Sequence, residues 1–313
     1  MSLSDLRDVF QPPEDLYPFE STWLDIAGFR MHYLDEGPRD APVVLMLHGN
    51  PTWSFYYRNL VLALRDRYRC IVPDHIGCGL SDKPGASQYP YTLKQRISDL
   101  GELMDHLQVT RPVHMIVHDW GGMIGFGWAA QRPGQIASMV IANTAAFPLP
   151  QEKKLPAALW LVRNTRLGAV LVQGLNAFSG LAARVAFKKP VSSRVRKAYK
   201  GPYDSWANRI ATLRFVQDIP LAPQDPGYEI IQATELRLPD FADKPCLLAW
   251  GEKDFVFDLH FLNKWKLIFP HAKVLSYPDC GHYIFEDAGQ PLTQAISDFL
   301  DENEHGTRHD ANL

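Results

Sequence analysis

The sequence predicts an α/β fold: a mostly parallel, doubly wound sheet with helices on both faces and a helical cap inserted into it. Short apolar runs alternate with helix-length segments along most of the 313 residues. The runs are continuously apolar, which is typical of strands covered on both faces of a parallel sheet. One long stretch, from Phe147 to about Pro239, contains no such run and predicts the insertion.

Five apolar runs predict the central strands, and the β-prone pieces STWLDI and FRMHYL predict that the sheet begins before them. In chain order the runs are VVLML (43–47), RCIVP (69–73), HMIV (114–117), MVIAN (139–143) and CLLAW (246–250). Polar residues come at or directly after the ends of these runs, at the edge where open α/β sheets place their sites. The segment TLKQRISDLGELMDHL, which starts at Thr92, keeps its apolar residues on one side and predicts an amphipathic helix.

The stretch 148–239 is rich in Leu, Ala, Arg and Lys and predicts a helical cap. The expected organisation is a first core part at 1–147, the cap at 148–239 and a second core part at 240–313. The polar end of the chain, from Glu302 onward, is expected to be a frayed tail.

Positive charge gathers in the cap. From Gln151 to Lys200 the chain contains eleven Lys and Arg residues and a single acid, Glu152. Two interpretations stay open: a solvated helical surface, or a docking patch for an acidic protein or a membrane surface.

The composition is that of a chain with a large core. Hydrophobic residues make up 46%, and 32 Lys+Arg against 35 Asp+Glu give a net charge of −3, which excludes disorder and predicts no nucleic-acid partner. The four cysteines form no CxxC pair and the N-terminal segment is charged, so a reducing, cytoplasmic location is expected. Apolar runs end well before ~20 residues, so no transmembrane segment is expected.

A turn in IVHDWGGMIGFGWA holds the candidate nucleophile, Asp119. A strand there runs straight into a helix, and Gly121 and Gly122 allow the tight turn of a nucleophile elbow. The usual G-x-S-x-G motif has serine where this chain has Asp119, which excludes a serine esterase. A carboxylate is ionised at neutral pH and attacks carbon without a base, forming a covalent ester.

A histidine and a second carboxylate follow in chain order. His282, in SYPDCGHYIFED, is the candidate base, because its pKa lies near operating pH. Asp254, in LLAWGEKDFVF, is expected to hold the imidazole tautomer, with Asp258 as its nearby competitor. Asn143 carries no charge and cannot take this role.

Two neutral donors are expected beside the nucleophile. Asn50 follows His48-Gly49, where the loop after a strand can offer N–H groups to an anion. Trp120 is next to Asp119, and its indole N–H is costly to bury without a partner. Together they suit a leaving group that departs as an anion.

Other residues predict no cofactor and no metal. His114 and His118 share a strand face, but no carboxylate or cysteine nearby completes a zinc site. G-x-G-x-x-G spacing is absent. His48 and His75 are expected to order loops, and Cys280 lacks a separate base for a nucleophilic role.

The motifs HGNPTW, PDHIGCGLSDKP, HDWGG, WGEKD and GHY together resemble the haloalkane dehalogenase branch of the α/β-hydrolase superfamily. NTAAFPLP, NAFSG and GPYDSWANRIATLRFVQDIPLAP resemble, within that branch, the β-lactone decarboxylases of bacterial long-chain olefin biosynthesis. The resemblance implies Asp119 as nucleophile, His282 as base and Asp254 as its partner. It also implies that Asn50 and Trp120 stabilise the leaving group.

The implied reaction is decarboxylation of a cis-3,4-dialkyl β-lactone to a cis-alkene and carbon dioxide. Hydrolysis of haloalkanes is the alternative. The family's decarboxylases work beside a synthetase and a reductase, so assembly with pathway enzymes or a homo-oligomer is expected. LPAALWLV and GAVLVQGL, in the cap, either line a tunnel for a hydrophobic substrate or only pack the cap.

Two further readings are weaker. An epoxide hydrolase needs cap tyrosines, for which Tyr199 or Tyr203 could serve, but Asn50 and Trp120 are not usual in epoxide hydrolases or fluoroacetate dehalogenases. A non-catalytic binding protein of this fold would be expected to have lost part of the set, and all five positions are present.

Overall fold

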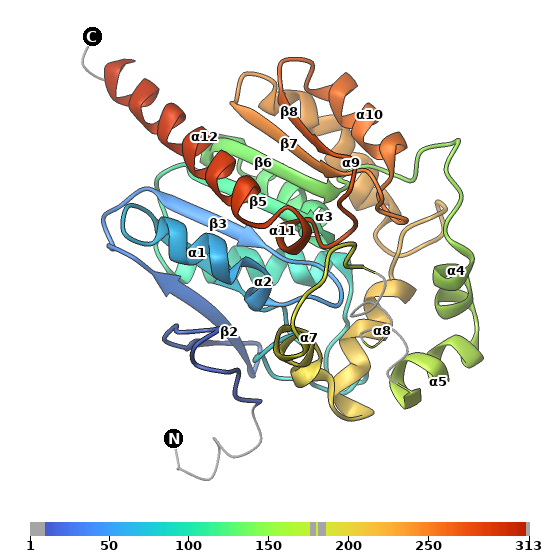
Figure 1. The fold of residues 1–313 in the computed structure, drawn as a ribbon. Helices are drawn as coiled ribbons and strands as arrows, with labels where there is room; N and C mark the ends of the chain where they lie inside the picture. The colour runs from blue at the N-terminus through green and yellow to red at the C-terminus, as the bar shows by residue number, and fades with distance from the viewer. Residues whose placement is uncertain (1–9, 176–179, 181–185, 311–313) are drawn as a thin grey trace.

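The computed structural model describes residues 10–175, 180 and 186–310, with side chains to Glu304. Its centre is an eight-stranded sheet of order β1-β2-β4-β3-β5-β6-β7-β8 (Figure 1). The strands are β1 (Thr22–Ile26), β2 (Phe29–Glu36), β3 (Val43–Leu47), β4 (Arg69–Pro73), β5 (Val113–Asp119), β6 (Ile136–Thr144), β7 (Cys246–Gly251) and β8 (Lys273–Tyr277). β2 pairs antiparallel with β1 and β4, and every other pairing is parallel. The predicted mostly parallel α/β sheet is confirmed.

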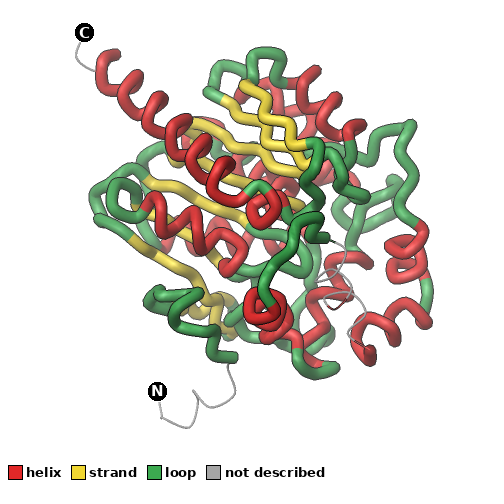
Figure 2. The backbone as a smooth tube through the Cα atoms, viewed as in Figure 1, coloured by secondary structure: helices red, strands yellow, loops and turns green. Residues whose placement is uncertain are grey.

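Helices cover both faces of the sheet (Figure 2). The core helices are α1 (Arg58–Leu64), α2 (Leu93–His106), α3 (Trp120–Ala129), α9 (Tyr228–Arg237), α10 (Leu259–Ile268), α11 (Ile284–Asp287) and α12 (Gly289–Asp310). The pleat sends alternate side chains of β3 to opposite faces. Leu45 and Leu47 join the core beneath α2, α3 and α10, whereas Val44 and Met46 join the core beneath α1, α11 and α12.

The segment between β6 and β7 is helical, as the sequence predicts. It contains α4 (Ala157–Asn164), α5 (Arg166–Leu175), α7 (Ser193–Lys200) and α8 (Ile210–Gln217), followed by α9. Figure 1 shows α4 and α5 at the outer edge of the molecule, away from the sheet. α9 instead packs on α3, so the chain returns to the core layers before β7 begins. Residues 176–179 of the NAFSG motif lie outside the described ranges.

Asn143 joins the two strands that carry this insertion. Its side-chain amide donates to the carbonyls of Gly251, at the end of β7, and Phe257, at 3.1 and 3.3 Å. Its Oδ1 accepts from the Gly251 N–H at 2.8 Å. The backbone at Asn143 has φ +36°, which turns the chain at this point.

The start of α2 and the end of α12 can be compared with the boundaries predicted from the sequence. Thr92 caps α2, because its side chain accepts a hydrogen bond from Gln95 N at 3.3 Å, as the amphipathic pattern from Thr92 predicts. The segment from Glu302 is expected to be a frayed tail, but in the structure it continues α12 as helix to Asp310. Glu304 accepts a hydrogen bond from His114 of β5, which ties this polar part of the helix to the sheet. Within the described ranges, no helix is both long and apolar enough to cross a membrane.

Candidate active site

Asp119 lies at the sharp turn between β5 and α3. Its backbone has φ +51° and ψ −124°, a strained conformation for a residue with a side chain. A Cβ on Gly121 would come within 2.0 Å of the Leu47 carbonyl oxygen, and one on Gly122 within 2.0 Å of Thr144 Oγ1. The two glycines therefore allow close approach to the neighbouring strands, in addition to the tight turn predicted from the sequence.

The structure brings Asp119, His282 and Asp254 together. His282 Nδ1 lies 2.8 Å from Asp254 Oδ2, and His282 Nε2 lies 3.6 Å from Asp119 Oδ2. Asp254 Oδ1 accepts from Val256 N at 2.8 Å. Because the Nδ1 N–H donates to Asp254, Nε2 is the ring nitrogen that faces Asp119.

The pKa values of Asp119 and His282 are both raised above their ordinary values, for different reasons. Burial raises the pKa of Asp119, and the nearby His282 together with hydrogen bonds from Asn50 and Trp120 limit that rise. Burial opposes the charge of His282, but Asp254 and then Asp119 raise its pKa above the ordinary value. Asp254 and Asp119 thus stabilise the charged form of His282, against the cost of its burial.

Asn50 approaches Asp119 through its backbone. Its N–H donates to Asp119 Oδ1 at 2.6 Å, while its side-chain Nδ2 donates to the Thr212 carbonyl of α8 at 3.0 Å. An amide nitrogen carries two N–H bonds, so this contact leaves one for a ligand. Asn50 Oδ1 is buried without a hydrogen-bond partner among the described residues. A Cβ on Gly49 would lie 1.9 Å from Asp119 Oδ1, so only glycine permits this approach.

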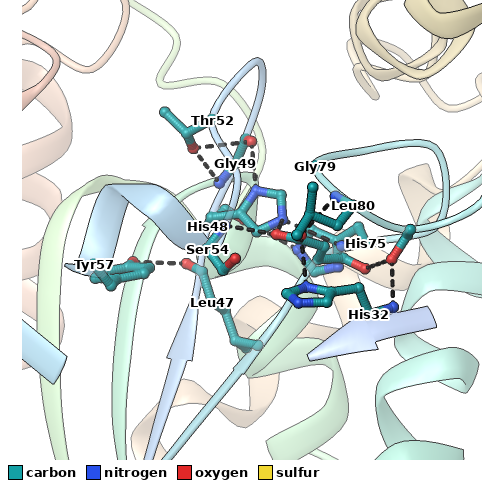
Figure 3. Close-up of polar contacts among 12 residues, drawn as sticks. His32, Leu47, His48, Gly49, Thr52, Ser54, Tyr57, His75, Gly79 and Leu80 are labelled. Carbon is teal, nitrogen blue, oxygen red and sulfur yellow. Dashed lines mark hydrogen bonds and ion pairs between the residues drawn. The ribbon is translucent and has the colours of Figure 1, made fainter. Parts of the chain in front are cut away.

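The loop that carries Asn50 is held at successive peptide groups (Figure 3). The Tyr57 hydroxyl donates to the Leu47 carbonyl at 2.8 Å, and His75 Nε2 donates to the His48 carbonyl at 3.0 Å. Thr52 Oγ1 accepts from Gly49 N at 3.2 Å and donates to Gly49 O at 3.1 Å. Such fixed donors need no reorganisation when charge develops on a ligand.

The ring of His48 adds a further tie to this loop. It donates from Nδ1 to the Gly49 carbonyl at 2.8 Å and accepts at Nε2 from His75 N at 3.2 Å. This pattern requires the neutral tautomer, and burial lowers the pKa of both His48 and His75. His48 and His75 thus order the loop, as the sequence predicts.

A buried carboxylate, Asp74, anchors the base of the loop. It accepts from Ser54 N at 2.6 Å and Leu80 N at 2.8 Å, and pairs with His32 Nδ1 at 2.9 Å. Burial opposes its charge, but the hydrogen bonds from His32 and from the Leu80 N–H hold its pKa below the ordinary value. Sequence reasoning missed Asp74 and His32 in this role, because they are 42 residues apart and their pairing depends on the sheet.

Trp120 lines the pocket beside Asp119, with a buried cation behind it. The ring of Trp120 packs against Phe215 of α8 at 5.1 Å between centroids. Arg96 of α2 places its guanidinium carbon 3.7 Å from the Phe215 centroid and 5.9 Å from the Trp120 centroid. Arg96 Nη1 donates to the Tyr91 carbonyl at 2.5 Å, and Nε and Nη2 have no hydrogen-bond partner among the described residues. Asp218 Oδ2 lies 3.8 Å from Arg96 Nη1, so a guanidinium that contacts both aromatic rings is paired with a buried carboxyl group behind Trp120.

These groups meet at the end of a cavity of about 280 Å³. Asn50, Asp119, Trp120 and His282 form its polar end, and apolar residues of the core and cap form the rest. The cap contributes Leu155, Ala158, Leu159, Leu161, Val162, Leu171, Val172, Val216, Ile219 and Leu221. Both predicted tunnel segments, LPAALWLV and GAVLVQGL, therefore line the cavity. Such a cavity fits an apolar substrate whose reactive group lies at one end.

Lys153 is the one lysine or arginine among the described residues that line the cavity. Its Nζ lies 2.6 Å from Asp258 Oδ2 and 3.5 Å from the Phe255 carbonyl. Asp258 also caps α10 by accepting from His260 N at 3.1 Å. Asp258 is thus a link between the cap entry and the core, and it is Asp254 that contacts His282.

The remaining candidates have structural partners. His114 contacts Ser138 and Glu304. His118 Nε2 donates to the His282 carbonyl at 2.8 Å and so fixes the backbone of the candidate base, a role the sequence did not indicate. Tyr199 bonds Glu286 at 2.5 Å and Tyr203 bonds the Thr52 carbonyl at 3.3 Å. Neither tyrosine lines the cavity, which argues against the epoxide hydrolase reading.

Comparisons with known proteins agree with the fold described above. A family model described as "alpha/beta hydrolase fold" matches residues 42–289. The chain is 56% identical to the cis-3-alkyl-4-alkyloxetan-2-one decarboxylase of Shewanella oneidensis, over 93% of this chain and 91% of that protein. It is 48% identical to the decarboxylase of the same name from Xanthomonas campestris, over 92% and 98% of the two chains.

More distant relatives are dehalogenases. Haloalkane dehalogenase 2 of Mycobacterium tuberculosis is 31% identical over 92% of this chain and 97% of that protein. The crystal structure of a haloalkane dehalogenase from Bradyrhizobium elkani superimposes with a TM-score of 0.82 at 25% identity, covering 92% of this chain and 99% of that one.

Proposed function

The chain belongs to the α/β-hydrolase family, and from that premise we propose that it is a β-lactone decarboxylase. The proposed reaction converts a cis-3-alkyl-4-alkyloxetan-2-one to a cis-alkene and carbon dioxide. The observation that carries the proposal is the 56% and 48% identity to two decarboxylases of this name along nearly the whole chain. The apolar cavity that ends at Asp119 supports it.

Asp119 is the proposed nucleophile, and the reaction balances without water. A carboxylate oxygen of Asp119 bonds to ring carbon 4 while the ring C–O bond breaks, giving an ester and a free carboxylate. The bond from carbon 3 to that carboxylate then breaks, and its electron pair forms the alkene. The ester oxygen leaves carbon 4 as the Asp119 carboxylate, and carbon dioxide departs. Inversion followed by anti elimination turns a cis-lactone into a cis-alkene.

The other site residues take supporting roles in this proposal. Asn50 and Trp120 stabilise the carboxylate that forms when the ring opens. His282, kept protonated by Asp254 and Asp119, stabilises Asp119 as it is released from the ester. No step requires His282 to remove a proton from water.

Haloalkane dehalogenase is the second candidate function, supported by the 31% identical relative and the superposition on a dehalogenase. In that reaction Asp119 displaces halide from an sp3 carbon, and neutral His282 activates water to hydrolyse the ester. Both reactions produce an anion beside Asn50 and Trp120. They differ in whether a base and water are needed afterwards.

The test follows alkene and bromide from the same protein, using a cis-3,4-dialkyl β-lactone and a 1-bromoalkane. We expect rapid alkene formation, little bromide, and a loss of at least 10³-fold in Asp119→Asn, because the nucleophile is lost. Asp279→Asn, which changes an exposed surface carboxylate, is the control and should behave as the unmodified protein. Fast bromide release without alkene would establish the dehalogenase.

We also infer where the protein works. The four cysteines, Cys70, Cys78, Cys246 and Cys280, are free thiols, which supports a cytoplasmic location. The lactone substrate supports a place in a route to long-chain olefins, in assembly with its other enzymes or as a homo-oligomer. α7, which Figure 1 shows apart from α4 and α5, carries Arg194, Arg196 and Lys197 as a basic surface for such contacts. A sharp monomer peak in size-exclusion chromatography at several salt concentrations would contradict the assembly.

A further inference from the structure

The outer side of α4 and α5 exposes large apolar side chains. Trp160 of α4 is 54% exposed, and Leu167, Val170 and Leu175 of α5 are 60%, 51% and 72% exposed. Trp206, 53% exposed, belongs to the same surface, because a Cβ on Gly174 of α5 would lie 3.4 Å from its ring. Single exposed leucines are common, but a group of this kind marks an interaction site. We call these five residues the cap face.

The same two helices are apolar on their inner side as well. Leu159 and Val162 of α4, and Leu171 and Val172 of α5, line the substrate cavity. A surface helix normally turns a polar side to water, so a pair of helices that is apolar on both sides is expected to be covered outside. Among the described residues, Figure 1 draws α4 and α5 at the outer edge of the molecule. The cap face is thus separated from the cavity by a single layer of helix.

Charge identifies what covers the cap face. From residue 153 to residue 203 the sequence has eleven Lys and Arg residues and no Asp or Glu, although Arg184 lies outside the described ranges. Lys154, before α4, and Arg166, the first residue of α5, are exposed beside the apolar group. Arg163 is engaged by Asp225 at 2.7 Å. The exposed acids Glu152 and Asp204 flank this stretch, which still carries an excess of cations. Apolar and tryptophan side chains with an excess of basic neighbours match the interface of an anionic bilayer.

We propose that the cap face docks on the surface of an anionic lipid bilayer, with Trp160, Trp206 and the leucines among the headgroups. This brings α4 and α5 between the bilayer and the cavity. The uptake of a two-chain lactone directly from the bilayer rests on the proposed function, since such a substrate partitions into lipid. The docking itself does not depend on that function.

Co-sedimentation with vesicles tests the docking. The full chain carrying Asp119→Asn, which prevents turnover, is mixed with vesicles of phosphatidylglycerol and phosphatidylcholine or of phosphatidylcholine alone. We expect binding to the anionic vesicles, weaker in 0.5 M salt because the charges are screened. Trp160→Ser with Leu167→Ser should weaken it at least tenfold, because two apolar contacts with lipid are lost. Arg166→Glu should weaken binding to the anionic vesicles alone, by roughly fivefold or more.

The matched control is Leu236→Ser with Leu267→Ser, which changes leucines that are 80% and 83% exposed outside the cap face. Vesicle binding should be unchanged in this control. Equal loss of binding in both double variants, or no binding to anionic vesicles, would overturn the proposal. A dimer in solution that Trp160→Ser with Leu167→Ser dissociates, in the absence of vesicle binding, would assign the face to protein contact and also overturn it.

The activity assay separates this proposal from the proposed function. With Asp119 restored, Trp160→Ser with Leu167→Ser should keep its rate on a dissolved short-chain lactone and lose it on a long-chain lactone presented in vesicles. If no lactone gives alkene while the vesicle binding persists, the decarboxylase function fails and the docking stands.

Discussion

The cavity has two walls of opposite character. The core wall, around Asp119 and the loop from Leu47 to Thr52, is polar and hydrogen-bonded at nearly every peptide group. The cap wall is apolar, and among its described lining residues Lys153 alone is charged. Hydrogen-bond geometry fixes positions to fractions of an ångström, whereas apolar contact selects only size and shape. The difference indicates that the core wall determines the reaction and the cap wall determines which substrate enters.

The largest effect is expected from a substitution at Gly49, in the core wall. Gly49→Ala would place a Cβ 1.9 Å from Asp119 Oδ1, so the nucleophile must move. We expect kcat to fall at least about 100-fold, because a displacement of about 1 Å has that effect in active sites. Gly134→Ala, where a Cβ would meet no atom within 4 Å, is the control. Steady-state kinetics on the lactone measures both, and a Gly49→Ala enzyme of normal kcat would contradict the comparison.

The pH dependence sharpens the role of the core wall. Turnover of a bromoalkane needs neutral His282, whose pKa is raised, so bromide release should fall tenfold per pH unit below that raised pKa. Alkene formation needs ionised Asp119 and uses protonated His282, so it should persist to lower pH than bromide release. It should fall when Asp119 is protonated, at a pH above the usual range of aspartate because its pKa is raised, and fall again above the raised pKa of His282. Profiles from pH 5 to 9 test this. Superimposable profiles for the two products would show that both reactions require neutral His282.

A smaller effect is expected when the loop from Leu47 to Thr52 loses hydrogen bonds but keeps its packing. Thr52→Val keeps the side-chain shape but removes both hydrogen bonds to Gly49. At about 1 kcal/mol for each of the two bonds, kcat should fall by up to roughly 30-fold while KM stays within twofold. Thr52→Ser restores the hydroxyl and should recover most of the rate. A change confined to KM would place Thr52 in substrate binding instead.

Substitutions in the cap wall are expected to change which substrate chain lengths the protein accepts. Val172, buried on α5, lines the cavity, and Val172→Phe narrows it. We expect kcat/KM for a long-chain lactone to fall roughly fivefold through overpacking, with little effect on a short-chain one. Val170→Phe, on the exposed side of the same helix, is the matched control. Equal losses on both chain lengths would show that Val172 affects the reacting end of the cavity.

The smallest expected effect concerns the ion pair that joins the two walls. Lys153→Met removes the contact with Asp258. The side chains of Lys153 and Asp258 are 12% and 27% exposed. The pair should contribute about 1 kcal/mol, which lowers Tm by roughly 2 °C in a chain of this size. Lys253→Met removes an exposed pair with Asp279 and should leave Tm unchanged in differential scanning calorimetry. Equal shifts in the two variants would show that the partial burial adds nothing.

Local signals predicted the sheet and the residues at its edge. Asp119 was found because a strand meets two glycines, and His282 and Asp254 because they follow later strands in the expected order. The anchor Asp74 and the cation Arg96 were not found, because their surroundings come from segments far apart in the chain, such as β2 and α8. The extent of α12 was missed because contact between Glu304 and His114, rather than a repeating pattern, accompanies its polar end.

The Asn143 amide has a consequence for how the molecule can change over evolution. It joins the carboxyl ends of β6 and β7, whereas the inserted segment leaves β6 at Thr144 and re-enters β7 at Cys246, which pairs with Met139 earlier in β6. The sheet therefore fixes both attachment points of the segment, and a connection with fixed ends tolerates changes of length at little entropic cost. We therefore expect the segment between Thr144 and Cys246 to be exchangeable with that of a relative. Such an exchange would change the substrate range while the Asp119 carboxylate stays in place.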